Sequence, residues 1–482
     1  MGYHLVDRIA DFLESLPERP VSPGESPEVI RDLIRAPLPE QGASPTPLLD
    51  EAANLLFDHS VFNGHPRFWG YITSSAAPIG ALAELLAAAV NPNVGGWMLA
   101  PIATEIEAQT VRWIAEMIGY PAECGGLLVS GGNMANFVAF LAARTAKAPW
   151  DIRTEGLLAG RQPLRVYASR ETHTWIQKAT DLFGLGTDAI SWIPTDDAQQ
   201  MDVDALEEQI VADQEKGYLP FLVVGAAGTV STGAVDPLSD IADICRKYEL
   251  WFHVDGAYGA FAAILPHAPD NMSGMREADS VALDPHKWLY SPLEAGCTLV
   301  RNPQHLLDAY SFHPEYYHFD ENVEESPVNY YEYGPQNSRG FRALKVWLAL
   351  RQVGRDGYAQ MIGDDIKLAQ DLCQLVDSHE ELEAFTHNLS ITTFRYVPNG
   401  LTPGREAIEA YLDELNRTLL TDLMEGGEVF LSNAVIGGKF VLRACIVNFR
   451  TTLDDIEALP GIVARRGRAL DAEMRPVDLR DI

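Results

Sequence analysis

The sequence is short of positive charge. It holds 36 lysine and arginine residues against 68 aspartate and glutamate residues, for a net charge of −32. Nucleic acids and anionic membranes are bound through basic surfaces, so this balance argues against both as partners. The acidic residues are spread along the chain, which is typical of a strongly solvated soluble protein.

Cysteines and long apolar runs are also scarce. The five cysteines are far apart and form no C-x-x-C motif, so neither a disulfide framework nor a zinc site is predicted, and a reducing compartment fits best. The most apolar segment, residues 76–90, contains Glu84 and is too short to span a bilayer. Acidic residues interrupt the N-terminal segment, which therefore lacks a signal-peptide pattern. We expect a soluble cytoplasmic protein without a metal site.

The centre of the chain has the pattern of an α/β fold. Between about residues 126 and 300, short apolar runs alternate with segments of helical periodicity, which predicts a mostly parallel sheet covered on both faces. In such sheets ligands bind beyond the carboxyl ends of the strands. The expected strands are 164–168, 189–193, 221–226, 250–254, 280–283 and 298–300, and the expected helices are 135–145, 173–182, 203–214 and 238–247.

The flanking regions have different patterns. Helices are expected near residues 5–13, 47–59, 76–90 and 104–118, with an extended, proline-rich path between the first two. After helices at 341–351 and 358–376, strands near 389–396, 429–432 and 440–447 alternate with helices near 404–423 and 453–465. We therefore predict an N-terminal helical arm that contributes to dimerisation (1–95), a large α/β domain (96–350) and a smaller C-terminal α+β domain (351–482).

The most distinctive motif is Asp284-Pro285-His286-Lys287-Trp288, directly after the predicted strand 280–283. An amine in apolar surroundings loses its proton more readily and can attack a carbonyl group. A lone lysine at a strand end is more often a surface residue. Asp255 directly follows the predicted strand 250–254, a position where a carboxylate needs a cation or strong hydrogen bonds.

Further polar groups follow other predicted strands. An apolar run from Leu127 leads into a Gly131-Gly132 turn and a helix start, which is an anion-binding arrangement, although an ordinary N-cap is the alternative. The G-x-G-x-x-G dinucleotide motif is absent. His173 lies at a strand-to-helix turn and Thr229 in a hydroxyl-rich loop. Together with Lys287 and Asp255, these groups are the set that pyridoxal 5'-phosphate (PLP) needs.

With these motifs the sequence resembles the group II PLP-dependent decarboxylases, the family of aromatic-L-amino-acid decarboxylase, over nearly the whole chain. The segments that carry the resemblance are HPRFWGYI (65–72), SGGNMAN (130–136), His173, HVDGAYGA (253–260), DPHKW (284–288), Tyr316-Tyr317, SRGFRALKVW (338–347) and LRACIVNFRTT (442–452). The resemblance implies fold type I and a homodimer with shared active sites.

The resemblance also implies residue roles. Lys287 would form the Schiff base, Asp255 would pair with the pyridine nitrogen, and His173 would stack on the ring opposite Ala257. Tyr316, on a loop of the family, would protonate Cα after carbon dioxide leaves. The remaining implied positions are Gly132, Asn133, Thr229, Asp284 and His286 around the cofactor, and Tyr71, Ser74, Gly95 and Ser338 around the substrate.

Some positions depart from the family pattern. Asp284 and Asn133 stand where relatives often have Asn and Ser. A carboxylate is awkward beside a phosphate, so Asp284 is expected to hold His286 or a backbone turn instead. Gly95 in place of a bulky residue would enlarge the pocket and suit an indole, whereas Ser338 favours phenolic or imidazole substrates.

We expect an aromatic substrate, tyrosine-like ahead of tryptophan-like. The alternatives are decarboxylation coupled to oxidative deamination, which yields an arylacetaldehyde, another reaction on the same fold, such as that of an aminotransferase or another carbon–carbon lyase, and a non-catalytic relative. Tyr316 and His173 disfavour the first alternative, because relatives with that activity tend to lack one of these residues. HPRFWGYI disfavours the second, and a non-catalytic relative would not need Lys287 together with Asp255.

Overall fold

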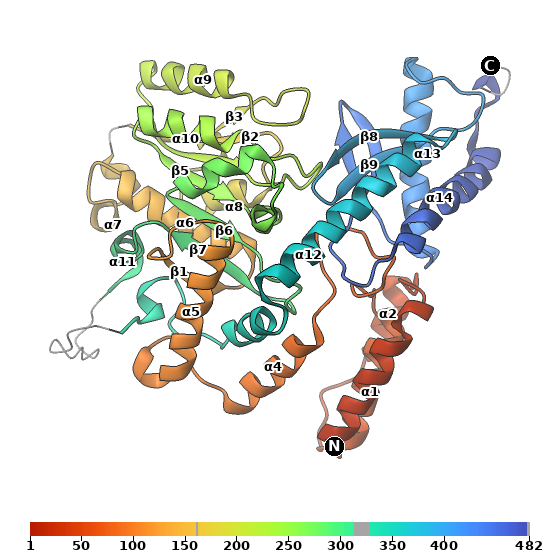
Figure 1. The fold of residues 1–482 in the computed structure, drawn as a ribbon, viewed down its shortest axis with the longest axis horizontal. Helices are drawn as coiled ribbons and strands as arrows, with labels where there is room; N and C mark the ends of the chain where they lie inside the picture. Colours follow the sequence, from red (N-terminus) through yellow and green to blue (C-terminus); the bar gives the residue numbers. More distant parts are fainter. Residues whose placement is uncertain (161, 313–326, 480–482) are drawn as a thin grey trace. The chain divides into compact units, whose positions relative to one another are not determined.

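The structure, a computed structural model, describes residues 1–160, 162–312 and 327–479 (Figure 1). The chain divides into two compact units, one formed by Met1–Ser75 with Asp365–Ile482 and the other by Ala76–Asp364. The predicted division into arm, large domain and small domain stays a prediction.

The unit Ala76–Asp364 is built around a seven-stranded sheet of order β1-β7-β6-β5-β4-β2-β3. Only β7 runs antiparallel to its neighbours, so the prediction of a mostly parallel sheet is confirmed. The strands are β1 (Gly125–Val129), β2 (Leu164–Ser169), β3 (Ile190–Ile193), β4 (Leu219–Ala226), β5 (Trp251–Asp255), β6 (Ser280–Leu283) and β7 (Gly296–Val300). Most of their residues are buried, as expected for a sheet covered on both faces.

Helices cover both faces of this sheet. Leu222 and Val224 of β4 belong to an apolar cluster with side chains of α6 and α8. A Cβ atom on Gly225 would instead contact Leu238 and Ile241 of α10, so α10 covers the opposite face. The helices of this unit are α4 (Pro78–Val90), α5 (Pro101–Met117), α6 (Gly132–Lys147), α7 (Ile152–Glu155), α8 (Trp175–Leu182), α9 (Val203–Glu215), α10 (Leu238–Lys247), α11 (Gln304–Tyr310) and the first part of α12 (Ala343–Asp377).

The second unit contains a four-stranded antiparallel sheet of order β10-β11-β9-β8. Its strands are β8 (Leu382–Asn388), β9 (Ile391–Tyr396), β10 (Ser432–Ile436) and β11 (Lys439–Cys445), and its helices are α1 (Gly2–Ser15), α2 (Pro27–Ile34), α3 (Pro45–His59), α13 (Glu406–Glu425), α14 (Leu453–Met474) and the end of α12. Apolar side chains of α13 and α14 form one core with β9 and β11. The predicted α+β character of the C-terminal region is confirmed.

The structure corrects several predicted elements. Pro27 does not continue an extended path but begins α2, because proline is well suited to the first helical turn and Ser26 accepts a hydrogen bond from Val29 N. The strand predicted at 429–432 lies further on, as β10, and β1 and β8 were not predicted. By contrast, the two helices predicted at 341–351 and 358–376 are both present and form the two parts of α12, which meet at a kink at Gly354, whose φ is 70°.

The sequence predicts no segment that is long and apolar enough to span a membrane. In the part of the chain that the structure describes, no helix combines enough length and apolar character to span a bilayer. None of the five cysteines, all of which lie among the described residues, forms a disulfide.

Candidate active site

The predicted site residues of the sheet unit lie at one edge of the sheet. Asp255 is the last residue of β5, and Lys287 follows β6 by a short turn. His173 follows β2 and Thr229 follows β4. Because these four strands are parallel, their carboxyl ends place the four side chains at the edge where α/β sheets bind ligands.

Lys287 is paired with Asp284. Its Nζ lies 3.1 Å from Asp284 Oδ2, and the side chains are 18% and 3% exposed. His286 Nε2 lies 3.7 Å from the same oxygen, while His286 Nδ1 donates to the Ala295 carbonyl at 2.7 Å. Asp284 was expected to hold His286 or a turn, and its nearer ionic partner is instead the lysine. Asp284 Oδ1 is buried and has no hydrogen-bond partner among the described residues.

The glycine turn lies against this ion pair. Gly131 is the N-cap of α6 with φ 88°, a conformation that favours glycine, and no side chain caps this helix start within the described chain. A Cβ atom on Gly132 would lie 2.6 Å from Asp284 Oδ2 and 3.3 Å from Ala257 Cβ. The absence of a side chain at Gly132 therefore lets the start of α6, Asp284 and Ala257 come together. The free N–H groups of a helix start can bind an anion such as a phosphate.

Asp255 is held by two hydrogen bonds. Its Oδ2 accepts from the indole Nε1 of Trp175 at 2.7 Å, and its Oδ1 accepts from the backbone N–H of Ala257 at 3.2 Å. Trp175 is fully buried in the first turn of α8. The two hydrogen bonds fix the orientation of the carboxylate. The contact of Trp175 was not predicted from the sequence.

His173 lies within the electrostatic reach of these groups. Desolvation of its ring lowers the pKa of His173, and the positive charge of Lys287 lowers it further, while the carboxylate of Asp255 raises it. Its Nδ1 accepts a hydrogen bond from Trp175 N at 3.3 Å. The lowered pKa favours a neutral imidazole at neutral pH. Because Nδ1 accepts a hydrogen bond, the single ring proton lies on Nε2. A neutral, flat ring within electrostatic reach of the amine and the carboxylate suits contact with an aromatic cofactor.

The other predicted positions are less tightly connected. Thr229 is 2% exposed and its Oγ1 lies 3.0 Å from Thr232 Oγ1. Ser338 is exposed. Gly95 does not open space as expected, because a Cβ atom there would lie 2.1 Å from the backbone oxygen of Asn337.

Three predicted residues lie outside this unit or outside the described chain. Tyr71 and Ser74 belong to the other unit. Tyr71 is 60% exposed, and its backbone carbonyl accepts a hydrogen bond from Arg443 at 3.0 Å. Tyr316 lies outside the described residues. The roles of these three residues stay predictions.

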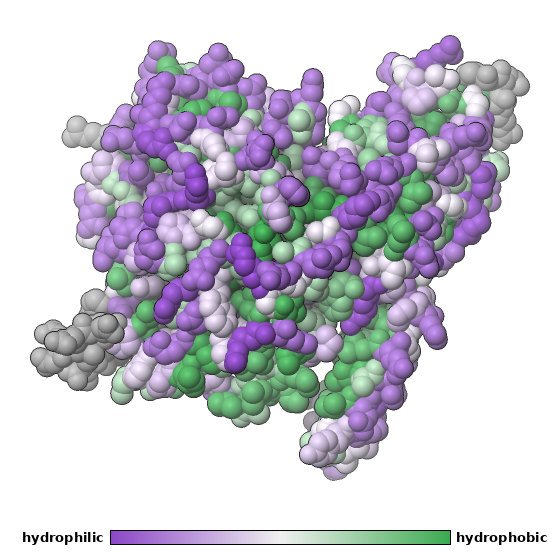
Figure 2. Space-filling model, in the orientation of Figure 1, coloured by the Kyte–Doolittle hydropathy of each residue, from purple (hydrophilic) through white to green (hydrophobic). Residues whose placement is uncertain are grey.

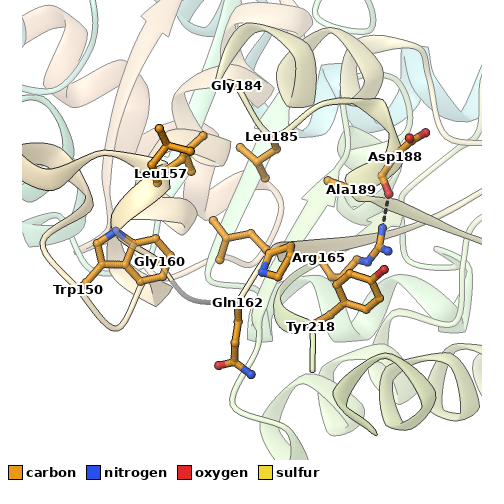
Figure 3. A pocket seen from close by; sticks show the side chains of 13 residues that line it. Trp150, Leu157, Gly160, Gln162, Arg165, Gly184, Leu185, Asp188, Ala189 and Tyr218 are labelled. Carbon is orange, nitrogen blue, oxygen red and sulfur yellow. Dashed lines mark hydrogen bonds between the residues drawn. The ribbon is translucent and has the colours of Figure 1, made fainter. Parts of the chain in front are cut away.

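A separate cavity of about 430 Å³ lies away from this edge (Figure 3). It is lined by Leu164 and Arg165 at the start of β2 and by Tyr218 just before β4. The Arg165 guanidinium donates to the Asp188 carbonyl across its wall (Figure 3). Because this cavity adjoins the amino ends of strands whose carboxyl ends lead to His173 and Thr229, it is distinct from the candidate site.

Comparison with known proteins agrees with this arrangement. Residues 27–397 match the model of the pyridoxal-dependent decarboxylase conserved domain. The chain is 35% identical to an aromatic-L-amino-acid decarboxylase of Bacillus atrophaeus, over 95% of this chain and 92% of that protein. It is 31% identical to tyrosine decarboxylase 2 of Arabidopsis thaliana, over 92% and 82% of the two chains. A crystal structure of Oryza sativa TDC with PLP and tryptamine superposes with a TM-score of 0.89 at 28% identity, covering 97% of each chain.

Proposed function

The chain belongs to the pyridoxal-dependent decarboxylase family, and from this premise we propose that it converts an aromatic L-amino acid to its amine and carbon dioxide. The observation that carries the proposal is that Lys287 and Asp255 lie at the same edge of the sheet. His173 lies within electrostatic reach of both. Curated relatives that act on aromatic amino acids support the substrate class.

The residues at this edge fit PLP. Lys287 supplies a primary amine, and Asp255 supplies a hydrogen-bonded carboxylate for the pyridine nitrogen. The uncapped start of α6 at Gly132 and Asn133 supplies N–H donors for the phosphate, with Thr229 and His286 as further cofactor contacts. Asp284 is the one member that opposes a phosphate, because its carboxylate lies against Gly132. Its buried Oδ1 nevertheless has no hydrogen-bond partner among the described residues, so a hydrogen-bond donor at this position would be stabilising.

When bound, PLP supplies an electron sink for the pair of electrons that the departing carboxylate leaves on Cα. The residues of the chain have complementary tasks. Lys287 Nζ, which lies 3.1 Å from Asp284 Oδ2, would hold the cofactor through its amine. Asp255, whose oxygens accept from Trp175 and Ala257, would pair with the ring nitrogen and support its protonated form.

Two further tasks concern the substrate. His173 and Ala257 are proposed to hold the ring between them, which fixes the direction of the bond to be broken relative to the ring. Tyr316 is proposed to donate the proton that Cα receives after carbon dioxide leaves. Exclusion of water from the closed site would restrict that proton to this donor.

The substrate pocket is proposed to include Tyr71, Ser74, Gly95 and Ser338. Ser338 favours a phenolic substrate, and the backbone contact at Gly95 removes the reason to expect extra room for an indole there. We therefore place tyrosine or dopa ahead of tryptophan. The test is incubation of the purified enzyme and PLP with tyrosine, dopa, tryptophan, phenylalanine, histidine and glutamate, followed by measurement of carbon dioxide and amine. Turnover of glutamate or histidine above every aromatic substrate would contradict the proposal.

The alternative product is an arylacetaldehyde. The proposed proton donor Tyr316 favours amine release, since a protonated Cα no longer reacts with oxygen. A Tyr316→Phe variant is expected to retain the cofactor and shift product from amine toward aldehyde, measured by chromatography of both products. Amine release at the wild-type rate would show that Tyr316 is not the donor.

The assembly proposed is a homodimer with shared active sites. An exposed apolar surface lies along α4 and the segment after it, and Figure 2 shows hydrophobic side chains gathered over α4. Its members are Leu82, Leu85, Leu86, Val90, Met98, Leu99 and Ile102, each more than half exposed. Surfaces of this kind mark protein interfaces. Sedimentation velocity should give twice the chain mass of 53.0 kDa, and a single-chain mass would contradict the dimer.

The proposed location is the cytoplasm. The absence of a disulfide among the five cysteines, all of them described, supports a reducing compartment. The acidic composition supports a protein free of anionic membrane surfaces.

A further inference from the structure

Trp175 is a fully buried tryptophan with an unusual acceptor. Its indole N–H donates to Asp255 Oδ2 at 2.7 Å. An indole nitrogen can only donate a hydrogen bond, and a bond to a carboxylate is stronger than one to a neutral acceptor. The two residues are 80 positions apart in the sequence and meet because α8 packs on the face of the sheet from which Asp255 projects. The second carboxylate oxygen accepts from a backbone N–H of the following turn.

The indole is itself fixed in place. Its ring meets the ring of His253 edge-on, with centroids 5.6 Å apart and planes at 81°. His253 is bound on both sides, by Ser280 Oγ at 2.8 Å and Asn136 Oδ1 at 2.7 Å. A donor wedged against a doubly bound buried ring has little freedom to turn, so the direction of its N–H is set before any ligand arrives.

The backbone of the same residue serves a second site group. Trp175 N donates to His173 Nδ1 at 3.3 Å. This bond does not depend on the indole, so a side-chain substitution at position 175 separates the two contacts.

We propose that Trp175 is a positioning residue for Asp255: its indole N–H fixes the carboxylate in the orientation that meets the ring nitrogen of PLP. This inference rests on the proposed role of Asp255 as the partner of that nitrogen. Trp175 belongs to none of the motifs that carry the family resemblance. An aromatic residue in a predicted helix is ordinarily expected to lie in the core.

The effect on cofactor binding follows from solvation. Without a ligand, water reaches the partly exposed Asp255 and compensates in part for a lost donor. A bound ring displaces that water, and the carboxylate then depends on its protein donors. Removal of the indole N–H should therefore weaken the ligand-bound state more than the free state, and only for a ligand whose ring presents an N–H to Asp255.

The test compares PLP with its 1-deaza analogue, in which a C–H group replaces the ring nitrogen. Dissociation constants are measured by equilibrium dialysis of apoenzyme for the wild type, Trp175→Phe, Trp251→Phe and Asp255→Asn. Trp251→Phe is the matched control, because it removes another buried indole N–H, which donates to Ser280 Oγ at 2.8 Å. The wild type should prefer PLP. Trp175→Phe should lose about ten- to a hundredfold of PLP affinity, the size expected for one hydrogen bond to a charged group, and little affinity for the analogue.

Each outcome has a distinct meaning. Equal weakening of both ligands by Trp175→Phe, or loss of the PLP preference in Trp251→Phe as well, would show a structural role and overturn the inference. An unchanged preference in Trp175→Phe, together with its loss in Asp255→Asn, would overturn the inference while leaving the role of Asp255 intact. A wild type without preference, or an Asp255→Asn variant that keeps it, would contradict the role of Asp255 itself.

An isosteric replacement guards against misfolding. Incorporation of 3-benzothienylalanine at position 175 keeps the two-ring shape and replaces the N–H with sulfur. This protein should show the same selective loss of PLP affinity as Trp175→Phe. Wild-type selectivity in this protein would overturn the inference.

Discussion

The buried ion pair between Arg339 and Glu107 gives a sharp test of what holds the sheet unit together. The side chains are 1% and 0% exposed. Arg339 also donates to the carbonyls of Val94 at 2.8 Å and Leu128 at 2.7 Å, and Leu128 N donates back to Glu107 at 2.9 Å. The pair therefore holds β1, which leads into the glycine turn, to α5.

Substitution Arg339→Met removes the cation and leaves a carboxylate in an apolar interior. Loss of one partner of a buried pair costs about 3–5 kcal/mol, because the remaining charge is unpaired. A second substitution, Glu107→Met, removes that charge, and buried pairs replaced by apolar residues are often close to neutral in stability. The double variant should therefore be more stable than Arg339→Met alone, even though it carries one more change.

The assay is urea unfolding of wild type, both single variants and the double variant at one protein concentration, followed by circular dichroism. A double-variant midpoint at or below that of Arg339→Met would show that the unpaired Glu107 carboxylate is not what destabilises Arg339→Met. So would a loss under about 1 kcal/mol in Arg339→Met, because it would mean that the remaining Glu107 carboxylate is readily solvated.

Two other predictions concern protons and charge at the site. Burial lowers the pKa of His253 from 6.5 to about 4, so the folded ring stays neutral while the unfolded ring gains a proton, and stability should fall as pH drops from 6.5 toward 4. The effect of His253 on the free energy of unfolding reaches roughly 3 kcal/mol. His253→Gln should flatten that part of the curve of urea midpoint against pH. Parallel curves for the variant and the wild type would contradict the pKa shift of His253. Asp284→Asn should tighten PLP binding several-fold in equilibrium dialysis, because it removes both the partner of the Lys287 ammonium and a negative charge beside the start of α6. Weaker binding would show that the carboxylate is a required contact.

The sheet was predictable because its strands are buried on both faces and interrupted at regular intervals. The residues of β6 and α10 were predicted at their observed bounds, since strong apolar periodicity and clear turn residues flank both. β1 was read only as an apolar run before the glycine turn, because Gly125 and Gly126 at its start weaken the strand signal. The path at Pro27 was predicted wrongly because proline disrupts a helix when it lies in the interior but is favourable in the first turn.

The candidate site was predictable where chemistry is carried by local motifs. Lys287, Asp255 and His173 each end or follow a strand, and their strands are neighbours or near neighbours in the sheet. The contacts made by Trp175 and Arg339 join segments 80 and 232 positions apart, and such partners depend on helix packing that local sequence does not encode. Gly95 shows the same limit, because its reason for being glycine is a backbone oxygen more than 200 positions away.

The central claim is that Lys287 holds PLP by its amine. The most direct measurement is borohydride reduction of the purified protein with its cofactor, proteolysis and mass spectrometry of the peptides, with Lys287→Ala as the control. We expect a single pyridoxyl-modified peptide that carries the group on Lys287, and no modified peptide from the control. A cofactor fixed to another lysine, or an unmodified Lys287 in protein saturated with PLP, would contradict it.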